Sequence, residues 1–473
     1  MGFNSIEYIL FLPLVTLIYY LLPAKLRWIL LLSASYLFYM MWSFKLSIII
    51  ISVTFFAYFF GLLLEKHRKK WLMLAGVFSV IALLIYYKYF NFFIDIINSI
   101  STKSGSLFQL NALDIILPVG ISFYTFQAIS YVIDVYRKKL PAEKHPGYFA
   151  LYISFFPQLV AGPIEKAGNL LPQLREKHSF KKENILEGGK ILLWGFFKKI
   201  VIADTLILYC NNIYNNVYSE SVSGFDFIFV QICFAYYIYC DFSAYSDIAT
   251  GSARLLGIKL QLNFNKPFSS MNFREFWTRW HITLSQWMKE YVFDPMGGIV
   301  RNNTFRTLLN VFVVFVLVGL WHGASYNFIA FGVVSSIYII IDYSSRNLRK
   351  RLFEKSGISK NKSVFKMISR TTVTLLFASL AFFFATKNID DAIYMLRNIT
   401  DFSTPFLKPK YFLWILFLIA LLEIFQFIQK KEFFHPFAGI KNTYLRMAVY
   451  NFLLFFILLF CDRGSVNFHY YQF

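Results

Sequence analysis

The chain has 473 residues, of which 57% are hydrophobic and 21% aromatic, and its formal net charge is +21. Apolar runs near membrane thickness alternate with short Lys and Arg clusters, which predicts an all-α polytopic membrane protein and excludes a soluble enzyme or a nucleic-acid-binding protein. The four cysteines lie within or beside apolar segments without C-x-x-C spacing, so they indicate neither a disulfide framework nor a metal site.

Five apolar runs open the chain, near residues 6–22, 28–43, 46–64, 71–96 and 113–136. The first has no basic residue before it and no small-residue cleavage site, so we expect a membrane helix there rather than a removed signal peptide. The connections between the runs are alternately rich and poor in Lys and Arg. This alternation predicts five successive crossings with the amino terminus outside.

The next apolar segment, 147–164, contains Pro157, Gly162 and Pro163 and has basic residues on both sides. We expect a re-entrant or partly buried segment, because irregular backbone at membrane depth is tolerated only where protein or a water-filled cavity satisfies it.

Two further crossings are predicted at 188–213 and 225–250, and both contain charged residues. These are Lys198, Lys199 and Asp204 in the first run, and Asp241 and Asp247 in the second. Either lysine can pair with a carboxylate on a facing helix, or the lysines can snorkel toward the membrane surface. The charges therefore have a structural interpretation as well as a functional one.

A different pattern occupies residues 266–298. Bulky apolar residues recur at three- and four-residue steps, namely Phe273, Phe276, Trp277, Trp280, Leu284, Trp287, Met288 and Tyr291. The opposite face carries Arg274, Thr278, His281, Ser285 and Lys289. This spacing predicts an amphipathic helix at the membrane boundary. On spacing alone, His281 is a solvated residue of its polar face.

Between Arg306 and Asp342 lie thirty-five residues without Asp, Glu, Lys or Arg, which predicts two membrane helices. His322 lies in the middle of this stretch, where an ionisable group is costly and is a functional candidate. A neutral histidine that donates to a neighbouring carbonyl is the structural alternative. Further runs at 367–386, 411–429 and 445–461 bring the expected total to eleven to thirteen crossings.

The two histidines suggest proton-transfer chemistry. Imidazole can take and return a proton near neutral pH, which an acyl transfer to a hydroxyl requires of its base. The small residues Gly323, Ala324 and Ser325 after His322 leave room for a substrate. Basic clusters on the cytoplasmic side would attract an anionic donor such as acyl-coenzyme A. A proton-coupled transporter would also place a histidine in the membrane, so the spacing does not dictate the reaction.

Six long motifs stand out along the chain: ILPVGISFYTFQAISYVIDVYR (116–137), FFPQLVAGPI (155–164), WGFFKKIVIAD (194–204), YCDFSAYSDIATGSARLLGIKLQLNFNKPF (239–268), FWTRWHITLSQWMKEYVFDPMGG (276–298) and LVGLWHGASYNFIAFG (317–332). They resemble the membrane-bound O-acyltransferase (MBOAT) family, in particular the bacterial branch that acetylates alginate, cellulose and peptidoglycan. The terminal NFHYYQF (467–473) is also similar to the ending of that branch. Six motifs in the family's order are far more specific than one W-H-G.

The resemblance implies a single integral membrane acyltransferase domain over 1–473, with its motif-bearing core at about 113–345. Its expected fold is a ring of about eleven to thirteen transmembrane helices around a thin central funnel, with re-entrant and amphipathic interfacial helices. The family's functional histidine falls on His322, and its second histidine falls on His281. We expect substrate contacts from Trp321, Asp241, Ser285 and Arg279. No metal or bound cofactor is expected.

The resemblance also implies a reaction. An acetyl group would move from a cytoplasmic thioester, acetyl-CoA or a similar donor, across the bacterial cell (inner) membrane to an extracytoplasmic polysaccharide. An extracytoplasmic partner of the SGNH-hydrolase type would make the final transfer to an alginate-like exopolysaccharide or to peptidoglycan. Two alternatives stay open, which are D-alanyl transfer to teichoic acid and a proton-coupled transporter or flippase.

Overall fold

The computed structural model describes residues 2–106, 108–301, 303–355, 363–403, 409–428, 437 and 440–461. Every regular element in these ranges is a helix, as the sequence predicts. The terminal motif 467–473 lies outside the described residues. The helices form two compact units, the first from Met1–Leu192 and Ser246–Gln261 and the second from most of the remaining chain. The single domain over 1–473 stays a prediction.

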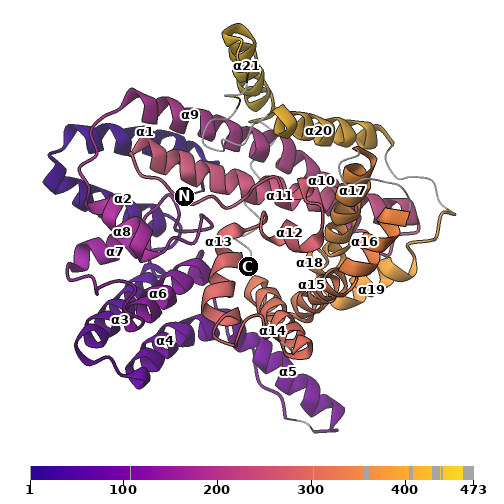
Figure 1. Ribbon diagram of the computed structural model, residues 1–473, viewed down its shortest axis with the longest axis horizontal. Coiled ribbons are helices and arrows are strands. Elements are labelled where there is room, and N and C mark those ends of the chain that lie inside the picture. The colour runs from indigo at the N-terminus through magenta and orange to yellow at the C-terminus, as the bar shows by residue number, and fades with distance from the viewer. Residues whose placement is uncertain are drawn as a thin grey trace. The chain divides into compact units, whose positions relative to one another are not determined.

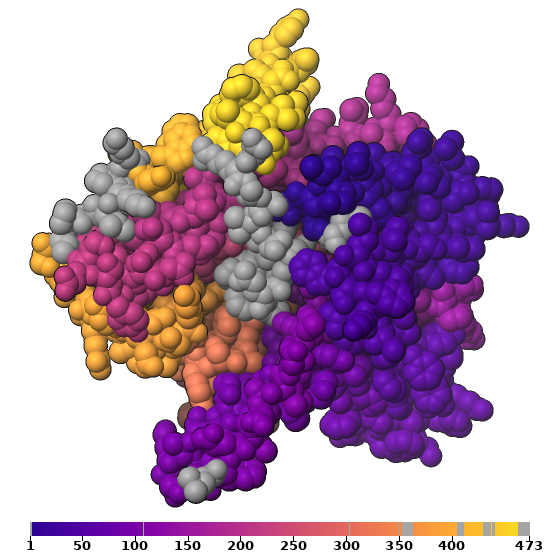
Figure 2. Space-filling view, turned by 180° about the vertical axis from the view of Figure 1, so that it is seen from behind, coloured from indigo at the N-terminus to yellow at the C-terminus, as the bar shows by residue number. Residues whose placement is uncertain are grey.

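Most helices of the first unit coincide with predicted apolar runs, while the helix Ala167–Arg175 lies outside them; Figure 1 shows the arrangement. They are α1 (Ile6–Leu21), η1 (Ala24–Leu26), α2 (Arg27–Met40), α3 (Ser47–His67), α4 (Lys70–Leu84), η2 (Ile85–Tyr89), α5 (Phe90–Lys103), α6 (Ile121–Tyr136), α7 (Pro146–Ser154), α8 (Ala167–Arg175) and most of α9 (Lys182–Phe196). The π-helical turn η2 joins α4 to α5. The α5 end of this long helix, in purple, extends away from the rest of the unit (Figures 1 and 2).

The second unit contains the segments that carry both candidate histidines. Its helices are η3 (Phe197–Ala203), α10 (Asp204–Tyr214), most of α11 (Gly224–Leu255), η4 (Pro267–Ser269), α12 (Phe273–Trp277), α13 (Ile282–Met288), η5 (Lys289–Phe293), α14 (Thr304–His322), α15 (Tyr326–Ser344), α16 (Arg346–Lys355), α17 (Ser363–Ser379), α18 (Ala381–Phe384), α19 (Ile389–Arg397), α20 (Pro409–Ile428) and α21 (Thr443–Phe460).

Within the described ranges, eight helices are long and apolar enough to cross a membrane. The sequence predicts eleven to thirteen crossings, and part of the difference lies in short helices. The helices α1, α2 and α6 have 16, 14 and 16 residues. Each is shorter than the ~20 residues of an untilted crossing, so it spans only where the bilayer thins or its flanking residues reach the surface. The exact count therefore stays a prediction.

Large apolar side chains cover the outward faces of these helices. On α1, Ile6, Leu10 and Leu21 are 75%, 68% and 75% exposed, and Phe427 of α20 is 88% exposed. Water would penalise such continuous apolar surfaces, whereas lipid chains do not, and helices satisfy their backbone polar groups internally. The chain is therefore a multi-pass membrane protein.

The run predicted at 113–136 is helical only from Ile121. Pro118 precedes the helix, and Gly120 adopts φ +76°, a left-handed conformation that disfavours side chains with a Cβ. A Cβ at Gly120 would also lie 2.7 Å from the carbonyl oxygen of Leu159. The close approach of the 155–164 segment thus accounts for the late start of α6.

The segment predicted to be re-entrant, 147–164, forms the short helix α7 followed by buried irregular backbone. All residues from Phe155 to Glu165 are buried. Side chains satisfy part of this backbone, because the Phe156 N–H donates to Ser35 Oγ at 3.1 Å and the Tyr152 hydroxyl donates to the Glu165 carbonyl at 3.1 Å. The segment fits the requirement that irregular buried backbone find partners within the protein.

The helices α14 and α15 form a tight hairpin that positions His322. Gly319 of α14 lies against the Phe328 carbonyl, and a Cβ on Gly332 of α15 would lie 2.5 Å from the Phe315 carbonyl. Small residues at both positions let the two backbones approach closely, as in other membrane helix pairs. This close packing places the carboxyl-terminal end of α14, with His322, against α15.

Candidate active site

The segment that carries His281 is not the single amphipathic helix predicted from its spacing. Asn272 caps α12 by accepting from the Glu275 N–H at 3.0 Å, and α12 ends at Trp277. His281 adopts φ +42°, which interrupts the helix before α13 begins at Ile282. The histidine is only 1% exposed, so the interpretation of a solvated His281 is wrong.

Asn263 holds the buried His281 ring. Its side-chain oxygen accepts from Thr283 Oγ1 at 2.9 Å and lies 3.1 Å from His281 Nδ1. Because that oxygen is an acceptor, Nδ1 carries the proton and Nε2 is the acceptor nitrogen of the ring. The Asn263 carbonyl also accepts from the Ile282 N–H at 2.9 Å. This backbone hydrogen bond stabilises the break between α12 and α13.

Burial lowers the pKa of His281 to about 3, because a desolvated site disfavours the imidazolium form. The ring is therefore neutral at physiological pH. A general base works best with a pKa near the operating pH. His281 thus suits a neutral hydrogen-bonding role better than that of the principal proton acceptor.

His322 is the last residue of α14. Gly323 follows in an extended conformation, and a Cβ there would collide with the Phe328 ring, so the chain turns into α15 over a small residue. The His322 ring is 3% exposed and packs edge-on against Phe331 and Phe384, at centroid distances of 5.6 and 5.0 Å. Its orientation is thus set by aromatic packing on two sides.

The two histidines line the same cavity, which has a volume of about 240 Å³. One face of α14 contributes five residues to it, namely Val311, Val314, Phe315, Val318 and His322. Steps of three and four residues put them in one row along the helix. From Val311 to His322 this row is roughly 16 Å long at a rise of 1.5 Å per residue. The cavity is therefore elongated, with His322 at one end of the row.

All five residues predicted on the polar face of 266–298 line this cavity: Arg274, Thr278, His281, Ser285 and Lys289. The periodicity identified the face correctly. This face lines an open cavity, in which the Lys289 side chain is 67% exposed and His281 is buried. Arg274 Nε donates to Asp342 Oδ2 at 3.0 Å, and Lys289 Nζ lies 2.9 Å from Asp294 Oδ2. Two cations thus border an otherwise largely apolar space.

The sequence model of the membrane-bound O-acyltransferase family matches residues 31–384, which include both histidines. The chain belongs to this family. It is 38% identical to the probable alginate O-acetylase AlgI of Azotobacter vinelandii over 350 residues, which are 72% of this chain and 68% of that protein. The peptidoglycan O-acetyltransferase of Helicobacter pylori is 32% identical over 436 residues, or 83% of this chain and 78% of that protein.

A more distant relative is the teichoic acid D-alanyltransferase of Bacillus subtilis, 29% identical over 230 residues. That match covers 46% of this chain and 57% of the relative. Membership in the family makes the protein an O-acyltransferase. The cavity with its two histidines is then the candidate active site of this acyltransferase.

The four expected substrate contacts occupy different places. Ser285 lines the cavity, and its hydroxyl donates to the Trp277 carbonyl at 3.0 Å. Trp321 packs against both histidine rings, at 5.5 Å from His281 and 4.9 Å from His322. Trp321, Asp241 and Arg279 are not among the residues that line the histidine cavity. Arg279 instead pairs with Glu275 at 2.7 Å.

Asp241 belongs to a buried charged cluster of the second unit. Lys199 Nζ lies 2.8 Å from Asp241 and 2.9 Å from Asp204, and Lys198 donates to Ser243 at 2.7 Å. The sequence left two interpretations for these lysines, pairing with a carboxylate or snorkelling toward the membrane surface. The structure confirms pairing for Lys199. This ion pair and this hydrogen bond connect η3 to α11.

Sequence reasoning missed Asn263, Phe331 and Phe384, which hold the two histidine rings. Asn263 precedes His281 by 18 residues, a separation that no helical or strand period indicates. The sequence pattern did predict that Arg274 lies on the same polar face as His281. Among the described residues, no group of three or more His, Cys, Asp and Glu is placed to hold a metal ion.

The lowered pKa of His281 predicts how acid affects stability. Below its ordinary pKa of 6.5 the unfolded chain binds a proton that the folded protein excludes, so folding weakens as the pH falls toward 3. The loss is about 1 kcal/mol per pH unit below 6.5. Between pH 7 and 5, the apparent unfolding temperature in detergent should fall more for wild type than for His281→Gln. Equal falls would contradict a buried neutral His281.

Proposed function

We propose that the protein is a membrane O-acetyltransferase that moves acetyl from a cytoplasmic thioester, acetyl-CoA, toward an extracytoplasmic polysaccharide. The observation that carries this proposal is the single elongated cavity bordered by both His281 and His322. The relatives named for alginate and peptidoglycan O-acetylation support an alginate-like exopolysaccharide or peptidoglycan as the final acceptor.

In the proposed reaction, His322 is the general base. It takes the proton of an acceptor hydroxyl as the oxygen attacks the thioester carbonyl, and the ester forms as the carbon–sulfur bond breaks. The proton then passes from the imidazolium to the departing thiolate, which leaves as the free thiol. His281, neutral and held by Asn263, positions the reacting groups by hydrogen bonding through Nε2. A transient acetyl on His322 is a variant of this scheme.

The cavity suits an extended thioester arm. Its walls along α14 are apolar, while Arg274 and Lys289 supply positive charge at its border. An anionic donor is attracted by such cations, and an apolar passage strengthens electrostatic interactions at the reaction centre by excluding water. Ser285 would then contact the acyl group, and Trp321 would hold the two histidine rings in place.

We further propose that the protein works in the cell membrane of a bacterium with a partner. The acetyl group would be handed to an extracytoplasmic acetyltransferase of the SGNH-hydrolase type, which completes transfer to the glycan. No bound cofactor or metal enters this scheme, because the donor is a substrate and the base is a side chain.

The test is reconstitution of the purified protein in vesicles with acetyl-CoA and a soluble acceptor glycan, with and without the partner. Donor-dependent thiol release with acetyl ester on the glycan is expected. Ester-bound D-alanine instead of acetate, when both donors are offered, would indicate the D-alanyl transferase. Substrate flux in vesicles without any acyl donor would indicate a transporter and overturn the proposal.

A further inference from the structure

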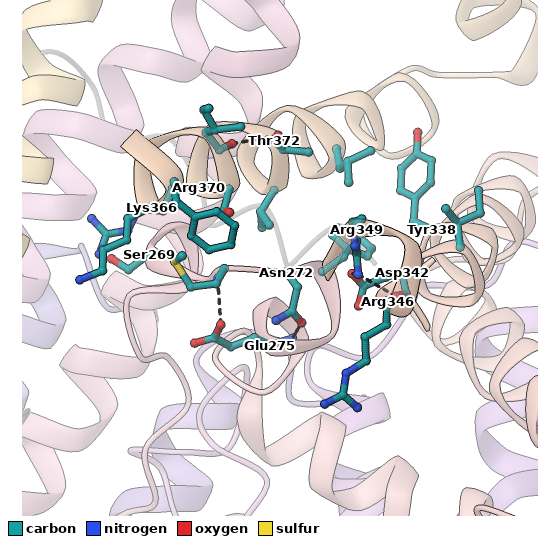
Figure 3. Close-up of a pocket in the computed structure, with 18 of the residues that line it drawn as sticks. Ser269, Asn272, Glu275, Tyr338, Asp342, Arg346, Arg349, Lys366, Arg370 and Thr372 are labelled. Atoms are coloured by element: carbon teal, nitrogen blue, oxygen red, sulfur yellow. Dashed lines mark hydrogen bonds and ion pairs between the residues drawn. The ribbon is translucent and has the colours of Figure 1, made fainter. Parts of the chain in front are cut away.

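A second, larger cavity lies in the same unit as the histidine cavity and shares no lining residue with it. Its volume is about 1000 Å³, and it is bordered by η4, α12, α15, α16 and α17 (Figure 3). Figure 3 shows Lys366 and Arg370 of α17 on one side and Arg346 and Arg349 of α16 on the other. The cavity is thus lined by cations from two separate helices.

Positive charge exceeds negative charge in this second cavity. The lining cations are Arg279, Arg346, Arg349, Lys366 and Arg370, and the carboxylates are Glu275 and Asp342. Both carboxylates are already engaged. Glu275 pairs with Arg279 at 2.7 Å, and Asp342 pairs with Arg349 at 2.6 Å and with Arg274 at 3.0 Å.

Arg346, Lys366 and Arg370 form no close ion pair with a carboxylate among the described side chains, although Arg370 interacts with Glu423 at longer range. Lys366 and Arg370 are four residues apart on α17, so they lie on the same face of that helix. An anion beside them would accept charge-assisted hydrogen bonds from both side chains. A phosphate group, with several acceptor oxygens, matches this pair of Lys and Arg donors.

The remaining wall is apolar and belongs to membrane helices. Tyr338 and Ile341 of α15 and Ile368, Val373 and Leu376 of α17 line the cavity. Both helices are long and apolar enough to cross a membrane. A basic end beside an apolar helix surface fits an amphiphile whose phosphate binds the cations while its acyl chains follow the helices. A free phosphate ester would leave this apolar wall unused.

We propose that the second cavity binds the headgroup of an anionic phospholipid. The excess of Lys and Arg in and around α16 places this end of α15 on the cytoplasmic side, where the leaflet's anionic lipids attract basic segments. The phosphate lies against Lys366 and Arg370, while Arg346 adds positive charge on the opposite side of the cavity (Figure 3). The acyl chains lie along α15 and α17. The site is separate from acyl transfer and does not depend on the proposed reaction.

The test measures lipid binding to the purified full chain in detergent by native mass spectrometry, with phosphatidylglycerol and phosphatidylcholine as probes. Wild type should prefer phosphatidylglycerol by about tenfold or more, since each cation near an anionic lipid contributes on the order of 1 kcal/mol. The double variant Arg346→Gln/Lys366→Gln should lose that preference. Arg349 is left intact, because it also holds Asp342, the partner of Arg274 in the histidine cavity.

The matched control is Lys25→Gln/Lys387→Gln, which removes two exposed lysines outside the cavity and should keep wild-type preference. A second variant, Ser369→Trp, fills the cavity without changing charge and should also lower phosphatidylglycerol binding. Preference retained in both cavity variants would overturn the proposal. So would displacement of phosphatidylglycerol by inorganic phosphate or 3′,5′-ADP at comparable concentration, because the site would then hold a soluble phosphate.

Discussion

Replacement of His322 with alanine should abolish acetyl transfer while the protein stays folded in the membrane. His322 ends α14 at one end of the elongated cavity, and no other described histidine except His281 lines that cavity. Loss of a positioned general base typically lowers the rate by about 10²–10⁴-fold. The measurement is thiol release from acetyl-CoA together with acetyl ester on the acceptor glycan.

Two controls separate chemistry from folding. His322→Gln keeps most of the side-chain volume between Phe331 and Phe384, so it should fold like wild type and still be inactive. His67→Ala removes an exposed histidine at the end of α3 and should keep full activity. Wild-type acetylation by His322→Ala, with normal yield after purification, would refute the assigned role.

The largest expected effect on stability follows from Lys199→Met. Lys199 is fully buried, and its ammonium lies between the carboxylates of Asp204 and Asp241 at 2.9 and 2.8 Å. Removal of the cation leaves the buried Asp241 carboxylate and the largely buried Asp204 carboxylate without their shared counter-charge. Breaking a buried ion pair in this way costs about 3–5 kcal/mol. The apparent unfolding temperature in detergent should fall much further than it does when an exposed lysine is replaced with methionine.

The matched control is Lys182→Met at the exposed start of α9, which should leave the unfolding temperature nearly unchanged. The triple variant Lys199→Met/Asp204→Asn/Asp241→Asn removes the negative charges as well and should recover part of the lost stability. If the triple variant is less stable than Lys199→Met, repulsion between the carboxylates is not the cause.

Much of the helical architecture followed from local sequence. Apolar runs predicted α1, α3, α11, α14 and α15 closely, because a helix in lipid satisfies its own backbone and needs only a long apolar stretch. Predictions were less accurate where backbone conformation depends on distant partners. Pro118 and Gly120 are local signals for the late start of α6, but the packing of Leu159 against Gly120 is visible only in the folded chain.

The candidate active site likewise combines features that local sequence predicts with features that depend on residues distant in the chain. The three- and four-residue spacing of 266–298 identified the polar face on which Arg274, His281 and Ser285 lie, but it predicted one continuous helix and a solvated histidine. The structure breaks that helix at His281 because Asn263, distant in the chain, binds both the ring and the backbone after it. A periodic pattern carries no information about such a partner.

The sequence alone determined that this chain is a multi-pass helical membrane protein with two histidines in family-specific settings, since composition and local motifs depend only on neighbouring residues. The tertiary structure decided that His281 and His322 border one cavity, that His281 is neutral and held by Asn263, and that Lys199 is enclosed by two carboxylates. Burial and the distance between residues far apart in the chain exist only after packing, and those quantities set the chemistry of the site.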